Sequence, residues 1–248
     1  MNITLIIPCY NEETNIQKGV LDKIGNYAAS HRYIKEVLIS DDGSTDLSKD
    51  IIKERYLKQF KFMRLVENTH RGKAYAVISG IQSAKEEYVV FMDIDLATPV
   101  EEIERLIAEA EQGYHIVIGS RKGSRAGAPL PRKVMAVGFI VVRNIILGLR
   151  GIKDTQCGFK LFKKDVALNV ISKLRVFHKP HTISGSSVSA GFDLEFLFVA
   201  QKLNYKIREI PVTWRHVETK NVSFLRDTFE TLLDIARIKY YDIRGRYE

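Results

Sequence analysis

The chain has 248 residues, of which 45% are hydrophobic, so it can bury a sizeable core. Its two cysteines, Cys9 and Cys157, are too few for a disulfide framework, and we expect both to be reduced in a cytoplasmic protein. The net charge of +8 would suit nucleic acid, but the aromatic residues are scattered and no nucleic-acid motif is present. We expect no nucleic-acid partner, because an anionic surface or a phosphate-bearing substrate explains the charge with fewer assumptions.

Strands and helices alternate along the first half of the chain. We expect strands near residues 3–7, 36–40, 61–66, 87–92 and 114–119, and helices near 12–30, 46–59, 72–85 and 99–112. Because parallel strands need crossover connections, this alternation predicts one α/β domain over residues 1–248, with a mainly parallel, doubly covered sheet. Two long loops, 119–131 and 173–191, are typical of lids or binding loops.

Polar residues follow the first two of these strands. The first strand is expected to break at Pro8 into a loop, with a helix from about Glu12, and the second ends at Asp41 and Asp42. Ligands of open α/β sheets bind outside the carboxyl ends of the strands. We therefore expect these ends to converge with the acidic end of the strand near 87–92 on one crevice.

That third strand end carries two carboxylates, Asp93 and Asp95, separated by one residue. Side chains two residues apart on an extended chain point the same way, so both can face one point in space. Hard oxygen ligands suit Mg²⁺ or Mn²⁺, which takes one or two protein carboxylates and completes its shell with substrate phosphates. The pattern predicts a metal site for a nucleoside diphosphate, and the alternative is a strand end with two solvated acids.

Other chemistries lack their motifs in this chain. It contains no dinucleotide-binding glycine motif, no P-loop and no nucleophile elbow, and its histidines show no zinc spacing supported by cysteines. A sugar nucleotidyltransferase would be expected to have a glycine-rich basic loop after the first strand, where this chain has Pro8 to Glu12. A basic binding module is the non-enzymatic alternative.

Five segments occur in an order that is typical of one family: Pro8-Cys9-Tyr10-Asn11-Glu12, Asp41-Asp42-Gly43-Ser44-Thr45-Asp46, Gly72-Lys73, Asp93-Ile94-Asp95 and Gly119-Ser120-Arg121. The chain resembles the inverting GT-A glycosyltransferases of family 2, and within them the polyprenyl-phosphate (dolichyl-phosphate) hexose synthases. Residues 151–162, 191–195 and 209–214 resemble the dolichyl-phosphate β-glucosyltransferase branch. The resemblance implies a Rossmann-like nucleotide-sugar-binding fold and UDP-glucose as donor, with a GDP-mannose-dependent dolichyl-phosphate mannose synthase as the alternative.

The resemblance also implies roles for individual residues. The nucleotide-binding residues would be Pro8, Tyr10, Glu12, Asp41, Asp42 and Lys73. Among them Asp42 would accept a hydrogen bond from the base, and Lys73 would meet a phosphate. Asp93 and Asp95 would hold the Mg²⁺ or Mn²⁺ that neutralises the departing diphosphate. Asp46 would either join the pocket or cap the following helix.

The expected acceptor is a polyprenyl or dolichyl phosphate, which is already an anionic nucleophile. It must be bound and oriented, but it needs no general base. Cationic residues cluster after the fifth predicted strand, at Arg121, Arg125, Arg132 and Lys133. By resemblance, Arg121 and Arg132 are the acceptor-phosphate ligands. Asp193 and Glu195 occupy the position where hydroxyl-using relatives place a base, so a glycan-extending transferase stays an alternative; here they would orient the arginines or the sugar.

Two segments are candidates for contact with an anionic membrane surface. Residues 134–149 are strongly apolar, but Arg143 and Asn144 interrupt them, so we expect a helix that lies in the interface without spanning it. A second amphipathic helix is expected near 222–243, and the alternative for both is packing on the sheet. The expected location is the cytoplasmic face of a membrane, as a peripheral protein without a secretory signal.

Overall fold

The computed structural model describes residues 1–121, 130–177, 190–215 and 224–247. Most of the two predicted loops, 119–131 and 173–191, lies outside these residues. The cysteines are free thiols, and both are buried.

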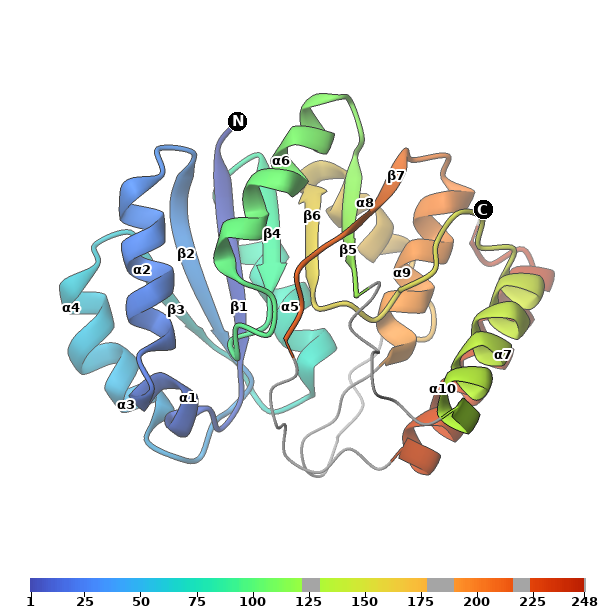
Figure 1. The fold of residues 1–248 in the computed structure, drawn as a ribbon, viewed down its shortest axis with the longest axis horizontal. Coiled ribbons are helices and arrows are strands. Elements are labelled where there is room, and N and C mark those ends of the chain that lie inside the picture. Colours follow the sequence, from blue (N-terminus) through green and yellow to red (C-terminus); the bar gives the residue numbers. More distant parts are fainter. Residues whose placement is uncertain (122–129, 178–189, 216–223, 248) are drawn as a thin grey trace.

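Within the described residues, seven strands form one sheet in the order β3-β2-β1-β4-β6-β5-β7 (Figure 1). The strands are β1 (Ile3–Cys9), β2 (Ile34–Asp41), β3 (Met63–Glu67), β4 (Tyr88–Met92), β5 (Ile116–Ser120), β6 (Phe159–Lys163) and β7 (Ile207–Pro211). Strand β6 is antiparallel to its neighbours β4 and β5, and the other pairs are parallel. The mainly parallel sheet is confirmed, and β1, β2 and β4 are adjacent, so the three polar strand ends meet as predicted.

Helices cover both faces of the sheet. On each face a separate hydrophobic cluster lies between the helices and the sheet. One face carries α1 (Glu13–Gln17), α2 (Val20–Ser30), α3 (Ser48–Ile51), the π-helical turn η1 (Ile52–Tyr56), α4 (Leu57–Gln59), the 3-10 turn η2 (Val100–Glu102) and α6 (Ile103–Glu111). The other carries α5 (Lys73–Ser83), α8 (Lys164–Lys173) and α9 (Ala190–Lys202). The prediction of a doubly covered sheet is therefore confirmed.

Three local expectations from the sequence are corrected by the structure. Strand β1 does not break at Pro8, because its pairing with β2 continues to Cys9, whereas its pairing with β4 ends at Ile6. The helix expected over residues 12–30 is divided at Gly19, whose φ of +79° favours glycine. The helix expected over 46–59 contains the π-helical turn η1.

Helices α7 (Leu130–Leu147) and α10 (Phe224–Ile243) lie at one end of the sheet, where α10 packs against both α9 and α7. Arg143 of α7 was expected to interrupt an interfacial helix, but only 2% of it is exposed. Its guanidinium donates to the Ile152 carbonyl at 2.8 Å and to Thr155 Oγ1 at 3.0 Å. Arg143 thus anchors α7 to the loop before β6. None of the described helices is long and apolar enough to cross a membrane.

Close packing of α5 on β1 predicts an unusual response to a helix-stabilising change. A Cβ added at Gly80 would lie 2.5 Å from Ile6 Cγ2, whereas one added at Gly138 of α7 would meet nothing within 4 Å. Gly80→Ala should lower the free energy of unfolding by about 1–3 kcal/mol through overpacking. Gly138→Ala, the matched control, should raise it by about 0.5–1 kcal/mol. Denaturant titrations measure both, and a Gly80→Ala protein as stable as the parent would contradict the packing argument.

Candidate active site

The loops that follow β1 and β2 are joined by side-chain hydrogen bonds. The Asn11 N–H donates to Ser44 Oγ at 2.9 Å, and the Glu12 N–H donates to Ser48 Oγ at 2.9 Å. Asp46 Oδ2 accepts from the Glu13 N–H at 3.1 Å, and its Oδ1 accepts from the Ser48 N–H at 3.0 Å. The N-cap of α3 is Leu47, so the two alternatives for Asp46 stay predictions. These bonds fix the two loops as one surface at the carboxyl edge of the sheet.

Asp41 is the last residue of β2 and Asp42 follows it, and both are buried. Asp41 Oδ2 accepts from the N–H groups of Gly43 and Ser44 at 2.9 and 3.0 Å, while its Oδ1 has no hydrogen-bond partner among the described residues. Both oxygens of Asp42 are engaged by the loop before α5, through His70 Nδ1, the Arg71 N–H and the Gly72 N–H at 2.7 to 2.9 Å. Asp42 therefore organises this loop, and its expected contact with a base stays a prediction.

The residues expected on the nucleotide side lie beside this loop. The Tyr10 ring stacks on the His70 ring, with centroids 4.1 Å apart and 12° between the planes. Pro8 is buried within β1, and Glu12 Oε2 accepts from Asn15 Nδ2 at 2.6 Å. The fold thus brings Pro8, Tyr10 and Glu12 to the same edge as Asp41 and Asp42, and their contacts with a nucleotide stay predictions.

Asp93 and Asp95 follow β4 at the centre of this edge. Asp93 forms an ion pair with Lys73, the first residue of α5. Gly158 leaves room for the Asp93 carboxylate, because a Cβ there would lie 2.1 Å from Asp93 Oδ2. Asp95 Oδ1 accepts from the Ala97 N–H at 2.9 Å. The structure therefore presents both acids at one strand end, with a lysine beside the first.

The charges of these groups influence one another. Burial raises the pKa of the Asp95 carboxyl, and the negative charge of Asp93 adds to this rise, although the Ala97 N–H opposes it. Burial works against the Lys73 ammonium, but Asp93 and other nearby carboxylates outweigh it and raise the pKa of Lys73. In the described part of the chain no three acidic, histidine or cysteine side chains form a metal-binding group. A cation bound here would combine two carboxylates with oxygens of the substrate, as Mg²⁺ and Mn²⁺ do.

Asp154 holds Arg121, the residue after β5, through three hydrogen bonds. Its Nε and Nη2 donate to the two oxygens of Asp154 at 2.8 Å each, and its backbone N–H donates to the same carboxylate at 2.9 Å. Burial alone would raise the pKa of the Asp154 carboxyl, but its bonds with Arg121 outweigh burial and lower that pKa. Glu209 of β7 supports the clamp by accepting from the Asp154 N–H at 3.2 Å.

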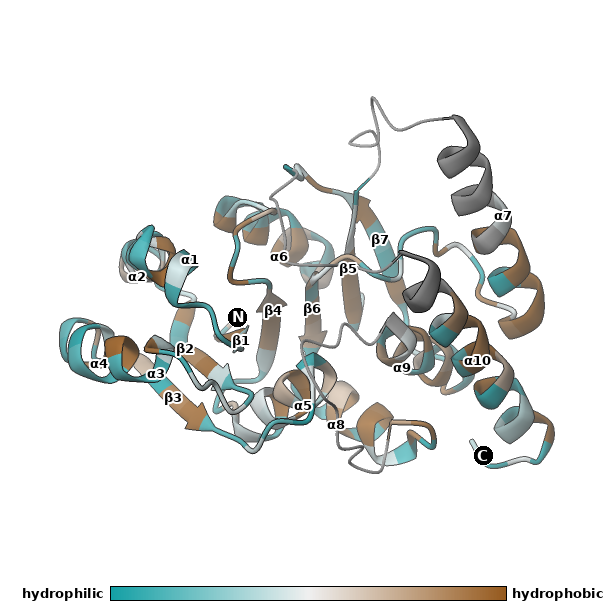
Figure 2. Ribbon diagram, turned by 90° about the horizontal axis from the view of Figure 1, so that it is seen from below, coloured by the Kyte–Doolittle hydropathy of each residue, from teal (hydrophilic) through white to brown (hydrophobic). Residues whose placement is uncertain are grey.

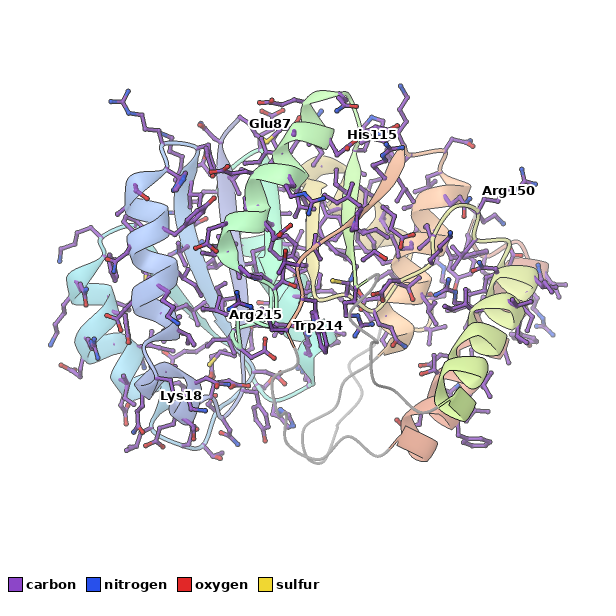
Figure 3. All side chains as sticks on the ribbon, viewed as in Figure 1. Lys18, Glu87, His115, Arg150, Trp214 and Arg215 are labelled. Carbon is purple, nitrogen blue, oxygen red and sulfur yellow. The ribbon has the colours of Figure 1, made fainter. Side chains whose placement is uncertain are left out.

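The Arg121 guanidinium lines a small pocket together with Asp93, the first of the two predicted metal ligands. The pocket is lined by Asp93, Ala97, Thr98, Arg121, Gln156, Gly158 and Trp214. The Arg121 guanidinium carbon lies 6.0 Å from the centroid of the Trp214 ring. Figure 3 shows Trp214 at the carboxyl edge of the sheet, below β4 and β6. Arg121 and Asp93 are therefore brought together, although 28 residues separate them in the sequence.

The two acids of α9 have different surroundings. Asp193 Oδ1 accepts from Lys160 Nζ of β6 at 2.9 Å. Glu195 is fully buried and accepts from the N–H groups of residues 175–177 and from the Tyr247 hydroxyl. Glu195 is thus used to hold a loop and the C-terminal segment, and the expectation that it orients arginines or the sugar is wrong, because both of its oxygens are engaged in the core.

The side chains of the other three basic residues in the predicted acceptor cluster lie outside the described residues. Arg132 and Lys133 belong to α7, but their side chains lie outside the described residues, and Arg125 lies outside them entirely. Sequence reasoning assigned no role to Asp154, Lys160 or His70. Asp154 and Lys160 fall in a segment that carries the family resemblance, whereas His70 falls in none of these segments. Each of the three contacts a site residue that is 28 to 33 positions away in the chain.

The chain is similar in sequence to proteins of known family. Residues 4–170 match the family described as Glycosyl transferase family 2. The chain is 31% identical to a dolichyl-phosphate beta-glucosyltransferase of Trichomonas vaginalis, with 99% of this chain and 75% of the relative covered. It is 30% identical to a dolichyl-phosphate beta-glucosyltransferase of Dictyostelium discoideum, with 98% and 75% covered.

Solved structures show the same fold. Glucosyl-3-phosphoglycerate synthase from Mycobacterium tuberculosis, in complex with Mn²⁺, UDP-glucose and phosphoglyceric acid, matches with a TM-score of 0.67 at 16% identity over 96% of this chain and 80% of that chain. Mannosyl-3-phosphoglycerate synthase from Rubrobacter xylanophilus matches with a TM-score of 0.62 at 13% identity over 99% and 75%. The predicted GT-A fold is confirmed, and the chain is a glycosyltransferase that belongs to glycosyl transferase family 2.

Proposed function

We propose that this glycosyltransferase moves glucose from UDP-glucose to dolichyl phosphate or a similar polyprenyl phosphate, with inversion at the sugar. The relatives that match nearly the whole chain are named dolichyl-phosphate beta-glucosyltransferases, which supports both the sugar and the acceptor. The structural neighbour bound to UDP-glucose and Mn²⁺ supports the donor class and a divalent cation.

The observation that carries the proposal is the pocket shared by Arg121 and Asp93. A phosphate nucleophile is already ionised near neutral pH, so it needs a fixed cation and no base. The Asp154 clamp holds the Arg121 guanidinium in one orientation beside the carboxylate that would meet the donor diphosphate. Arg121 would therefore bind the acceptor phosphate within reach of the sugar.

Donor binding would use the remaining groups at the sheet edge. Asp93 and Asp95 would hold Mg²⁺ or Mn²⁺, which supplies neutralisation of the departing nucleoside diphosphate. Lys73 is near enough to Asp93 to add its charge to the same phosphates. Asp42 would accept a hydrogen bond from the base, with Asp41 beside it at the end of β2. Tyr10 and Pro8 would shape the same side of the pocket.

We also propose that α7 and α10 lie on the anionic, cytoplasmic surface of the membrane that contains the acceptor. Both helices expose large apolar side chains: Val141, Val142 and Ile145 on α7, and Phe229, Leu232, Leu233, Tyr240 and Ile243 on α10. Figure 2 shows hydrophobic residues along both helices. The basic residues Arg150, Arg237 and Arg244 are close to them in the chain and would meet anionic headgroups.

A donor screen tests the proposed function directly. Purified protein, Mg²⁺ or Mn²⁺ and a polyprenyl phosphate are incubated with labelled UDP-glucose, UDP-galactose or GDP-mannose, and the lipid fraction is analysed. Label from UDP-glucose is the expected result. Label only from GDP-mannose would contradict UDP-glucose as the donor and indicate a mannose synthase. Transfer only to a glycan hydroxyl would contradict a polyprenyl phosphate as the acceptor.

Asp95→Ala tests the metal assignment. The variant should lose transfer activity and Mn²⁺-dependent UDP binding, because one of two carboxylate ligands is removed, while losing only about 1 kcal/mol of stability with the Ala97 bond. Calorimetry with UDP and Mn²⁺ measures the binding. Asp165→Ala removes a carboxylate with 68% of its side chain exposed and serves as the control. Full activity and unchanged Mn²⁺-dependent affinity in Asp95→Ala would contradict the assignment.

The membrane proposal predicts salt-sensitive binding to vesicles. The protein should float with vesicles that contain anionic lipid at low salt and be released at high salt, because headgroup attraction is screened over about 10 Å at 0.1 M. Ile145→Glu with Ile243→Glu should abolish flotation, since each of these side chains is 76% exposed. Leu47→Glu changes an exposed apolar residue on another part of the surface and should not. If the parent protein does not float at low salt, the surface is not a membrane contact.

A third comparison separates a phosphate acceptor from a hydroxyl acceptor. Arg121→Ala and Arg132→Ala should each raise the activation free energy of transfer by roughly 2–5 kcal/mol, the scale for removing one partner of a desolvated charge pair. Asp193→Asn should preserve much of the rate of the chemical step. Single-turnover rates at saturating donor and acceptor measure this. Arg105→Ala, with a half-exposed side chain, controls for the loss of a positive charge. A loss of about 10³-fold in Asp193→Asn, with both arginine variants near the parent, would indicate a hydroxyl acceptor and a general base.

A further inference from the structure

Lys160 is an unusually placed lysine. It lies on β6 with 1% of its side chain exposed, although lysines are almost never fully buried unless they are paired. Its ammonium donates to Asp193 Oδ1 at 2.9 Å and to the Cys157 carbonyl at 2.5 Å, and it lies 5.0 Å from the centroid of the Phe91 ring. A buried ammonium requires such partners, so this position is built around the charge.

Within this ion pair, Asp193 is the member that can reach a ligand. Its side chain is 18% exposed, against 1% for Lys160, so the lysine lies behind the acid. Asp193 is in the first turn of α9 and interacts electrostatically with Lys73 and Asp93 as well. The Lys73 ammonium lies 5.9 Å from the centroid of the same Phe91 ring. The pair therefore belongs to the diphosphate end of the site.

Two possible tasks for Asp193 were to orient arginines and to contact the sugar. The first is performed for Arg121 by Asp154, through three hydrogen bonds. An ionised carboxylate beside the proposed diphosphate centre is a strong acceptor for a sugar hydroxyl, because hydrogen bonds to a charged group are about twice as strong as neutral ones. That task requires the carboxylate to stay charged and fixed in direction.

Lys160 acts on both conditions. Burial raises the pKa of the Asp193 carboxyl above its ordinary value, and the largest influence that limits this rise is the Lys160 ammonium. Lys73 of α5 also lowers this pKa, and Asp93, after β4, raises it. Without Lys160 the carboxyl would take up a proton at a higher pH than in the parent protein. Its oxygen would also lose the ammonium that sets its direction.

We propose that Lys160 is a positioning residue, which holds Asp193 as an ionised, oriented acceptor for a hydroxyl of the transferred hexose. This inference rests on the proposed hexosyl transfer but not on the identity of the acceptor. Lys160 touches no substrate and acts through Asp193 alone.

The test is the pH dependence of UDP-glucose affinity, measured by calorimetry with Mn²⁺ and without acceptor. Lys160→Met should weaken binding by roughly 10- to 100-fold at low pH, the scale of a lost hydrogen bond to a charged group, and should recover as rising pH removes the Asp193 proton. Lys160→Arg retains the charge and should restore affinity. Lys160→Met with Asp193→Asn should be weak at every pH, because no carboxyl is left to titrate.

The matched control is Lys163→Met, which removes a lysine from the same strand where its side chain is 34% exposed. It should bind UDP-glucose as the parent does. A loss in Lys160→Met that is identical at every pH, or a pH-dependent recovery that persists in the double variant, would overturn the proposal. Circular dichroism shows whether each variant is folded, and the double variant keeps the test valid if an unpaired Asp193 damages the fold.

Deoxy-glucose donors identify the hydroxyl. In the parent protein, one UDP-deoxyglucose should bind about tenfold more weakly than UDP-glucose, and Asp193→Asn should bind the two equally. Equal discrimination by the parent and by Asp193→Asn across the panel would contradict the sugar contact. These measurements need no acceptor, so failure of lipid transfer in the donor screen would contradict the proposed function while leaving this inference intact.

Discussion

Negative charge gathered at one edge of the sheet is the constraint around which this site is built. Five aspartates lie along it: Asp41 and Asp42 at the end of β2, Asp93 and Asp95 after β4, and Asp193 in the first turn of α9. Carboxylates crowded together repel one another and become protonated unless positive groups or N–H donors compensate them. Most of the hydrogen bonds and ion pairs described at the site bring a positive group or an N–H donor to one of these carboxylates.

The groups that compensate these carboxylates differ between the three parts of the site. At the end of β2 the compensation comes from backbone N–H groups, which hold Asp41 and Asp42 and bend the following loops into shape. At the end of β4 it comes from Lys73, whose side chain is one-third exposed. Beside α9 it comes from Lys160, whose side chain is 1% exposed. The site thus combines a buried counter-charge with one that solvent reaches.

Much of this arrangement was accessible from the sequence because it depends on short spacings. The strand ends at Asp41 and Asp93 were recognisable from apolar runs that stop at acids, and parallel strands place such ends together. Strand β6 was missed because residues 159–163 lack the alternation with helices that marked the other strands, and an antiparallel strand needs no crossover helix. The clamp between Arg121 and Asp154 was missed because its two halves become neighbours only when β6 and the loop before it pack beside β5. The anchoring role of Arg143 was not predictable, because a charged residue in an apolar helix looks the same in sequence whether it faces headgroups or buried carbonyls.

The hydrogen bond between Tyr247 and Glu195 has a consequence for biosynthesis. Glu195 accepts from three backbone N–H groups of residues 175–177, but its fourth donor is a hydroxyl 52 positions further along the chain. During translation, α9 and the preceding loop are made well before residue 247 leaves the ribosome. Until then this carboxylate is incompletely satisfied and the side of α9 that α10 covers is open to water. Packing on this side of α9 is therefore completed only after residue 247 has been made, and until then the open surface of the nascent chain is exposed to aggregation.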